Sequence, residues 1–181
     1  MKFINTILAT ALLFSPFVQS TSFHQSGEIV HVPWELDELG RESKATTWEI
    51  LGDDLGVFIM KSFIVEDEPV NVGFEMEYIY ENGFMPTCNT DGYKRVKGSR
   101  FFQREAIWKF NGQAVKMATI CGPKGAGENV LSGMPLTEKG RLFVIELFKK
   151  ETDPVIVSGD YFELPVSVTN FTRTLNESVP L

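Results

Sequence analysis

Hydrophobic and polar residues alternate along much of the chain, and this period of two predicts β-strands. The clearest run covers residues 70–80, where every second residue is apolar: Val70, Val72, Phe74, Met76, Tyr78 and Tyr80. The residues between them are polar or Gly, with Ile79 as the exception. We therefore expect an amphipathic strand with one face on a core and one acidic face in water.

Asn111-Gly112 separates two further strand-like runs, 106–110 and 113–117. Asn-Gly favours a type I′ turn, because both central residues of that turn have positive φ. The register set by such a turn sorts apolar from charged residues, so turn chemistry and alternation agree on a β-hairpin. The expected pairs are Trp108 with Val115 and Ala106 with Met117 on one face, and Ile107 with Lys116 and Lys109 with Ala114 on the other.

Shorter patterns predict strands at 46–51, 57–65, 142–148, 155–157 and 161–168. Pro165 places the last strand at a sheet edge. Residues 137–150 also fit a helix, but Gly140 and the β-branched pair Val144 and Ile145 favour a strand there. A short helix is expected near 169–176. About seven or eight strands with little helix predict a mainly β domain, an antiparallel β-sandwich or barrel-like fold.

The N-terminus predicts export. Residues 1–20 combine Lys2, an apolar run over 7–17 and a small-x-small site at 18–20, which is the pattern of a cleaved signal peptide. The apolar run is shorter than the about 18 residues that span a bilayer. Residues 21–45 read as a polar extension, in which Trp34 either fills a groove of the domain or anchors a partner, and residues 46–181 as a single β domain. We expect a periplasmic or secreted monomer without a transmembrane segment.

The chain has two cysteines, Cys88 and Cys121. An oxidising compartment favours a disulfide between them. In the chain-entropy model such a bond stabilises the fold by about 3–4 kcal/mol, less any strain. His24 and His31 lie far away in sequence, so we expect no metal site.

The charge balance excludes some functions. The formal net charge is −7, from 17 Lys+Arg against 24 Asp+Glu, and it argues against a nucleic-acid partner. The chain lacks Gly-x-Ser-x-Gly, and residues 122–127 lack the Gly-Lys-Ser/Thr ending of a phosphate-binding loop. The acidic clusters at 53–54 and 66–68 are interpreted as solvated turns rather than Ca²⁺ ligands. We expect no catalytic residues and no cofactor.

One local segment departs from the acidic composition. Residues 91–100 contain four cations with no acid among them: Lys94, Arg95, Lys97 and Arg100. The aromatic residues Tyr93, Phe101 and Phe102 flank these cations. This segment follows Cys88, and a Gly-rich segment with Lys124 follows Cys121, so a disulfide would bring the two loops together. Such a surface suits carboxylate, phosphate or sulfate groups, because Arg offers a two-pronged donor and Gly admits a ligand to the main chain. The alternative is a solvated hairpin whose charges prevent aggregation at a sheet edge.

The C-terminal third of the chain resembles part of a known family. Cys121, the Gly140-Arg-Leu run and residues 162–171 resemble the tail of the invasion-associated protein B family of small exported bacterial proteins. The chain lacks the further cysteine expected of that family, and the resemblance implies no catalytic residues. We assign no family from it.

These observations predict an exported, non-catalytic binding or interaction module of the cell envelope. Its expected ligand is an anionic glycan, a lipid head group or a protein, held by the basic loops after the two cysteines. Two alternatives of other classes stay open. One is an envelope-polymer hydrolase that uses paired carboxylates. The other is a module that recruits a protein by edge-strand addition near Pro165.

Overall fold

The computed structural model describes residues 29–36, 43–51, 56–66, 69–80, 92–125, 128–159 and 162–178. The predictions for the signal peptide, for His24 and Cys88, and for acidic residues 53, 54, 67 and 68 lie outside these residues. The described part is mainly antiparallel β-structure, as the alternation predicts.

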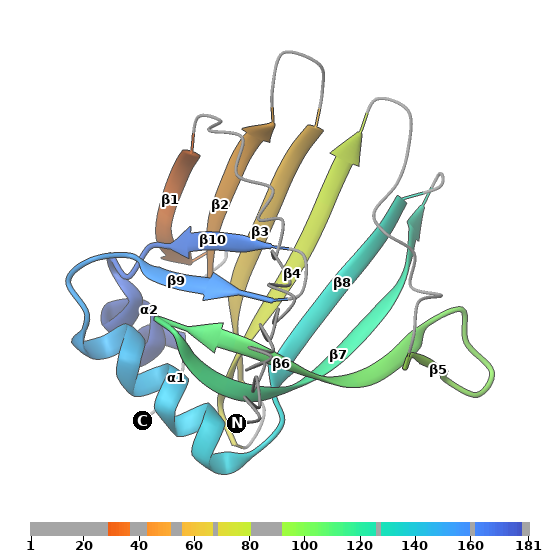
Figure 1. Cartoon of the computed structure of the whole chain (residues 1–181). Helices are drawn as coiled ribbons and strands as arrows, with labels where there is room; N and C mark the ends of the chain where they lie inside the picture. The colour runs from red at the N-terminus through yellow and green to blue at the C-terminus, as the bar shows by residue number, and fades with distance from the viewer. Residues whose placement is uncertain are drawn as a thin grey trace, which may run out of the picture.

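Ten strands form one sheet that curls into a nearly closed, barrel-like shape (Figure 1). The strand order is β1-β2-β3-β4-β8-β7-β6-β9-β10, with β5 paired to β6. The strands are β1 (Ile29–Leu36), β2 (Ser43–Leu51), β3 (Gly56–Val65), β4 (Asn71–Tyr80), β5 (Lys94–Arg95), β6 (Phe102–Phe110), β7 (Gln113–Gly125), β8 (Glu128–Pro135), β9 (Val155–Ser158) and β10 (Glu163–Val166). The expected number of seven or eight was therefore wrong: β5 has two residues and β8 has no regular alternation, and the segment of β1 was interpreted as a polar extension.

The β6–β7 hairpin has the predicted register, with Trp108 opposite Val115 and Ile107 opposite Lys116. Asn111 (φ 46°) and Gly112 (φ 80°) both have positive φ, as a type I′ turn requires. Asn111 also joins this turn to β9, because its Oδ1 accepts a hydrogen bond of 2.8 Å from Ile156 N. The turn residue thus fixes both the hairpin and the next strand.

Residues 138–150 form helix α1 (Glu138–Lys150), so the strand predicted at 142–148 was wrong. Thr137 caps the helix by accepting a hydrogen bond of 3.1 Å from Gly140 N. Glu138 in the first turn and two lysines in the last turn complement the helix dipole. Gly140 suits this helix because a Cβ there would lie 3.0 Å from Val115 Cγ1, so the helix can approach the sheet closely.

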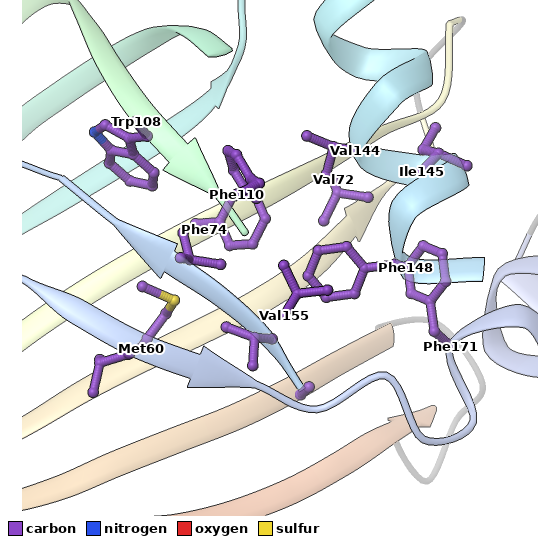
Figure 2. Packing of buried hydrophobic residues seen from close by; sticks show 14 of the residues in the cluster. Met60, Val72, Phe74, Trp108, Phe110, Val144, Ile145, Phe148, Val155 and Phe171 are labelled. Atoms are coloured by element: carbon purple, nitrogen blue, oxygen red, sulfur yellow. The ribbon is translucent and has the colours of Figure 1, made fainter. Parts of the chain in front are cut away.

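The core lies inside the curled sheet, where buried side chains of the strands face those of α1 (Figure 2). Apolar inner-face residues of β4 and β6 meet the buried face of the helix. Phe74 contacts Phe110 at 5.3 Å and Phe148 at 6.3 Å between ring centroids. The fully buried large side chains include Trp34, Met60, Phe74, Met76, Trp108, Phe110, Phe148 and Phe171.

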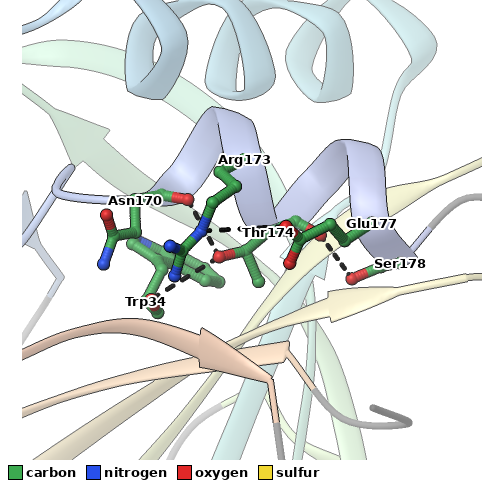
Figure 3. Close-up of polar contacts among 6 residues, drawn as sticks. All are labelled: Trp34, Asn170, Arg173, Thr174, Glu177 and Ser178. Carbon is green, nitrogen blue, oxygen red and sulfur yellow. Dashed lines mark hydrogen bonds and ion pairs between the residues drawn. The ribbon is translucent and has the colours of Figure 1, made fainter.

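Trp34 joins the first strand to the C-terminal segment. Its side chain is fully buried, and Nε1 donates a hydrogen bond of 2.7 Å to Ser167 O. Its backbone N donates to Thr169 O at 3.1 Å, and its carbonyl accepts from Thr174 Oγ1 at 3.5 Å (Figure 3). Trp34 therefore fills a groove of the domain, which decides between the two interpretations of this residue. The segment around it, 29–36, belongs to the sheet as β1.

The predicted C-terminal helix is present as α2 (Phe171–Ser178), and Phe171 packs on Trp34 with ring centroids 4.9 Å apart. The strand of Pro165 is the last in the sheet order, as expected. Thr47 Oγ1 on β2 donates a hydrogen bond of 2.8 Å to Pro165 O on β10. We call the contacts of Trp34 and Thr47 with residues 165–174 the seam. Neither described helix is long and apolar enough to cross a membrane.

Candidate anion-binding site

The basic residues of segment 92–100 lie on a short hairpin formed by β5 and the start of β6. Lys94 pairs with Gln103 and Arg95 with Phe102. We call residues 92–103 the basic hairpin. It projects from the sheet on the side remote from α1 and α2 (Figure 1). Strand pairing therefore fixes Lys94 and Arg95 against the start of β6.

The loop of the basic hairpin is held by its own hydrogen bonds. Val96 N donates to Phe101 O at 2.9 Å, and Ser99 N donates to Val96 O at 3.1 Å. The Ser99 hydroxyl donates to Val96 O and accepts from Phe101 N. Gly98 at φ 76° lets the chain reverse between these contacts. A loop tied in this way presents its side chains from a defined backbone.

All four predicted cations are exposed: Lys94, Arg95, Lys97 and Arg100. The side chain of Arg95 is oriented by a hydrogen bond of 3.1 Å from Nε to Ser99 O. None of the ion pairs within the described residues involves these four side chains. Their charges are therefore directed to solvent rather than to neighbouring acids of the described sheet.

An open hollow of about 730 Å³ lies beside the loop. Residues 95–101 and Pro123 of β7 line it. Phe101 is 40% exposed and packs on β7, where a Cβ added at Gly122 would overlap its ring. The hollow thus combines three cations (Arg95, Lys97 and Arg100) with the apolar surface of Val96, Phe101 and Pro123.

Strand pairing places the residues after Cys121, which belong to β7, next to the basic hairpin. Phe102 on β6 pairs with Cys121 on β7, which places Gly122 and Pro123 beside the basic hairpin. Cys121 is buried at 4% exposure. Because Cys88 lies outside the described residues, the disulfide stays a prediction. Lys124 belongs to β7 next to Pro123, but its side chain is likewise outside the description.

Tyr93 has a different position from the four cations. Its half-buried ring lies under the guanidinium of Arg104, with 4.6 Å between Arg104 Cζ and the ring centroid. This contact holds the start of the basic hairpin against β6. Tyr93 therefore supports the hairpin and does not line the hollow.

Sequence reasoning missed Pro123 as a lining residue, because its position depends on the pairing of β6 with β7. The sequence indicates Phe101 as an aromatic residue that flanks the cations, and Phe101 lines the hollow. Both add apolar surface beside the cations.

Other candidate chemistry on the described residues is sparse. No group of three or more His, Cys, Asp or Glu residues within them could hold a metal ion. Glu66 is exposed, and His31 Nδ1 lies 3.4 Å from Thr47 Oγ1 on the neighbouring strand. Comparison of the chain with protein families, curated proteins and solved structures finds no match.

Proposed function

We propose that this protein is an exported, non-catalytic binding module of the cell envelope that recognises an anionic ligand through the basic hairpin. The single observation that carries the proposal is the grouping of Arg95, Lys97 and Arg100 around one hollow, with Lys94 adjacent. An anionic glycan, a lipid head group or an acidic protein segment offers the complementary charge.

The acidic remainder of the protein supports selective binding at this hairpin. The formal net charge of −7 repels polyanions from the protein as a whole. At physiological ionic strength charges are screened over about 8 Å, so a ligand at the hollow responds to the nearby cations more than to distant acids. A locally basic site on an acidic protein therefore favours a defined contact over diffuse adsorption.

Export and the disulfide form part of the same proposal. A signal peptide over residues 1–20 delivers the chain to an oxidising compartment, where Cys88 and Cys121 form a disulfide. This bond would tie the segment before the basic hairpin to β7, next to Pro123. We propose that the mature chain acts there as a monomer.

The two alternatives receive less support. Strand addition at β10 is disfavoured, because Pro165 O already accepts from Thr47 Oγ1 and Ser167 O from Trp34 Nε1. No observation on the described part of the chain favours a hydrolase with paired carboxylates. We therefore do not propose either of them.

The test compares two variants with equal charge change. The site variant reverses all four hairpin cations (K94E, R95E, K97E, R100E). The control reverses four exposed lysines on other surfaces (K109E, K116E, K139E, K150E). Oxidised wild-type and variant proteins are passed over heparin resin and used to capture material from solubilised envelope extract, and Tm is measured for each.

We expect the site variant to lose its retention on heparin and its capture of envelope material, with an unchanged Tm. The control variant should keep its retention on heparin and its capture of envelope material. Retention of both variants at the wild-type level would place anion binding outside the basic hairpin. Loss of retention in both variants would show that net charge, rather than the hollow, controls retention. Either result would overturn the proposal.

A further inference from the structure

We infer that the hollow of the basic hairpin binds a phosphate ester carried on a sugar-sized ring, rather than a carboxylate or a free ion. The inference rests on the proposed anion-binding function and specifies its ligand. The number of cations, the hydrogen-bond donors of the loop, and the size and walls of the hollow support this ligand.

Three cations line the hollow, and the described residues supply no acid to its walls. A carboxylate carries one negative charge and two acceptor oxygens. It therefore pairs with one Arg guanidinium and leaves the charges of the other two cations uncompensated. A phosphate monoester carries about −1.5 to −2 charges at pH 7 and three acceptor oxygens. The charge and donor count of Arg95, Lys97 and Arg100 therefore match a phosphate better.

The donors are partly preorganised. Arg95 uses Nε on Ser99 O, which fixes its guanidinium and leaves its two terminal nitrogens without a hydrogen bond to the described residues. The loop N–H groups of residues 96, 99 and 101 are used within the loop, whereas those of Lys97, Gly98 and Arg100 have no partner within the described chain. A Cβ at Gly98 would meet nothing within 4 Å, so a ligand can approach the main chain there. Fixed donors lower the ordering cost of binding.

The hollow has room for more than a free ion. It is open to solvent, and its volume of about 730 Å³ admits a group larger than a single phosphate. The exposed part of Phe101 and Pro123 provide flat apolar surface beside the cations. A sugar ring offers C–H faces for such walls, while its phosphate reaches the cations.

Isothermal titration with four probes tests the inference: glucose 6-phosphate, glucose 6-sulfate, glucuronate and inorganic phosphate. We expect glucose 6-phosphate to bind tightest. Glucuronate has the same ring with a carboxylate, and inorganic phosphate lacks the ring, so each should bind about tenfold or more weakly. The sulfate ester, with one charge fewer than the phosphate, should lie between glucuronate and glucose 6-phosphate.

Single variants locate the contacts. R95K keeps the charge but removes the two-pronged donor, and we expect about a tenfold loss of affinity for glucose 6-phosphate. K97Q should also weaken binding, whereas K116Q is the matched control, because Lys116 on β7 is also exposed but does not line the hollow. F101L should reduce the preference for glucose 6-phosphate over inorganic phosphate.

The outcomes separate this inference from the proposed function. Glucuronate binding as tightly as glucose 6-phosphate, and lost in the four-cation variant, would keep the anion site and overturn the phosphate inference. Equal affinities for glucose 6-phosphate and inorganic phosphate would overturn the role of the ring. No binding of any probe, together with unaltered heparin retention in the four-cation variant, would overturn both proposals.

A vesicle experiment distinguishes the source of the phosphorylated ring. Phosphatidylcholine vesicles with and without phosphatidylinositol 4-phosphate present such a ring as a lipid head group. Binding to the phosphorylated vesicles that excess glucose 6-phosphate displaces assigns a lipid source, and binding of the soluble sugar alone assigns a glycan source. Vesicle binding that survives this competition would place lipid recognition outside the hollow and overturn the inference for lipids.

Discussion

Removal of the hydrogen bond from Trp34 Nε1 to Ser167 O should lower the free energy of unfolding by weakening the seam. In W34F the phenyl ring keeps most of the contacts with Phe148 and Phe171, whose centroids lie 5.9 Å and 4.9 Å from that of Trp34. The variant loses the donor to Ser167 O, which is 2.7 Å away in a buried setting. Leaving a buried carbonyl without its partner costs about 1–3 kcal/mol.

The smaller ring also leaves a void, and this adds about 1 kcal/mol to the loss of stability. We therefore expect W34F to lower the free energy of unfolding by about 2–4 kcal/mol. For a domain of this size, 1 kcal/mol corresponds to about 2–4 °C in Tm. The measurement is urea unfolding followed by far-UV circular dichroism, with a thermal melt as a second determination.

The matched control is W108F. Trp108 is 2% exposed and packs on Phe74 and Phe162, so it loses a similar volume on replacement. Its indole donates no hydrogen bond to the described residues, so W108F should cost about 1 kcal/mol. If W34F destabilises the protein no more than W108F, the hydrogen bond to Ser167 does not hold the seam and the reasoning is refuted.

Three further predictions concern single side chains. T47V removes the hydrogen bond to Pro165 O and should lower unfolding free energy by about 1–2 kcal/mol in urea; an unchanged midpoint would contradict this. S62A removes a fully buried hydroxyl without a partner in the described structure, so the urea midpoint should stay equal or rise, and a clear decrease would reveal a missed partner. A hydrogen bond from Lys149, together with its charge, lowers the pKa of Glu146 below its ordinary value of 4.5. Its stabilising effect is therefore present above that value and lost as pH falls through the lowered pKa, so the Tm difference between wild type and E146Q should close at acidic pH. A Tm difference that does not change with pH would contradict a stabilising role for the ionised Glu146 carboxylate.

The β6–β7 hairpin could be predicted from sequence because two local signals act on the same residues. The Asn111-Gly112 turn fixes the register, and the alternation around Trp108 fixes the buried face. Neither depends on distant parts of the chain. The same holds for β4, whose alternation is nearly complete.

Helix α1 could not be predicted in the same way, because its glycine has a tertiary role. Gly140 weakens a helix when judged by propensity alone. In the structure, its missing side chain lets the first turn lie against Val115 and Pro135. The capping Thr137 and the basic last turn were local helix signals that outweighed the β-branched pair Val144 and Ile145 once that pair faced the core.

Strand β1 was missed although residues 30, 32, 34 and 36 are apolar and alternate with less buried residues, because Pro33 within so short a run argues against a strand. Its register with β2 shifts between Val32 and Glu35. The bulge brings Trp34 to the C-terminal segment instead of to its neighbouring strand. In the candidate site, the grouping of cations followed from sequence, whereas the hollow required the packing of Phe101 on Gly122.

The placement of the seam and the basic hairpin makes stability and binding separable in this protein. The seam joins β1 and β2 to residues 165–174 beside the helices, whereas the hairpin projects from the remote side of the sheet (Figure 1). Distant sites without shared partners contribute additively to free energy. W34F should therefore lower Tm without changing the affinity for glucose 6-phosphate below the unfolding transition, whereas R95K should change affinity without changing Tm. Together, the two variants show whether a loss of binding arises at the hollow, because W34F reports separately what general destabilisation does to binding.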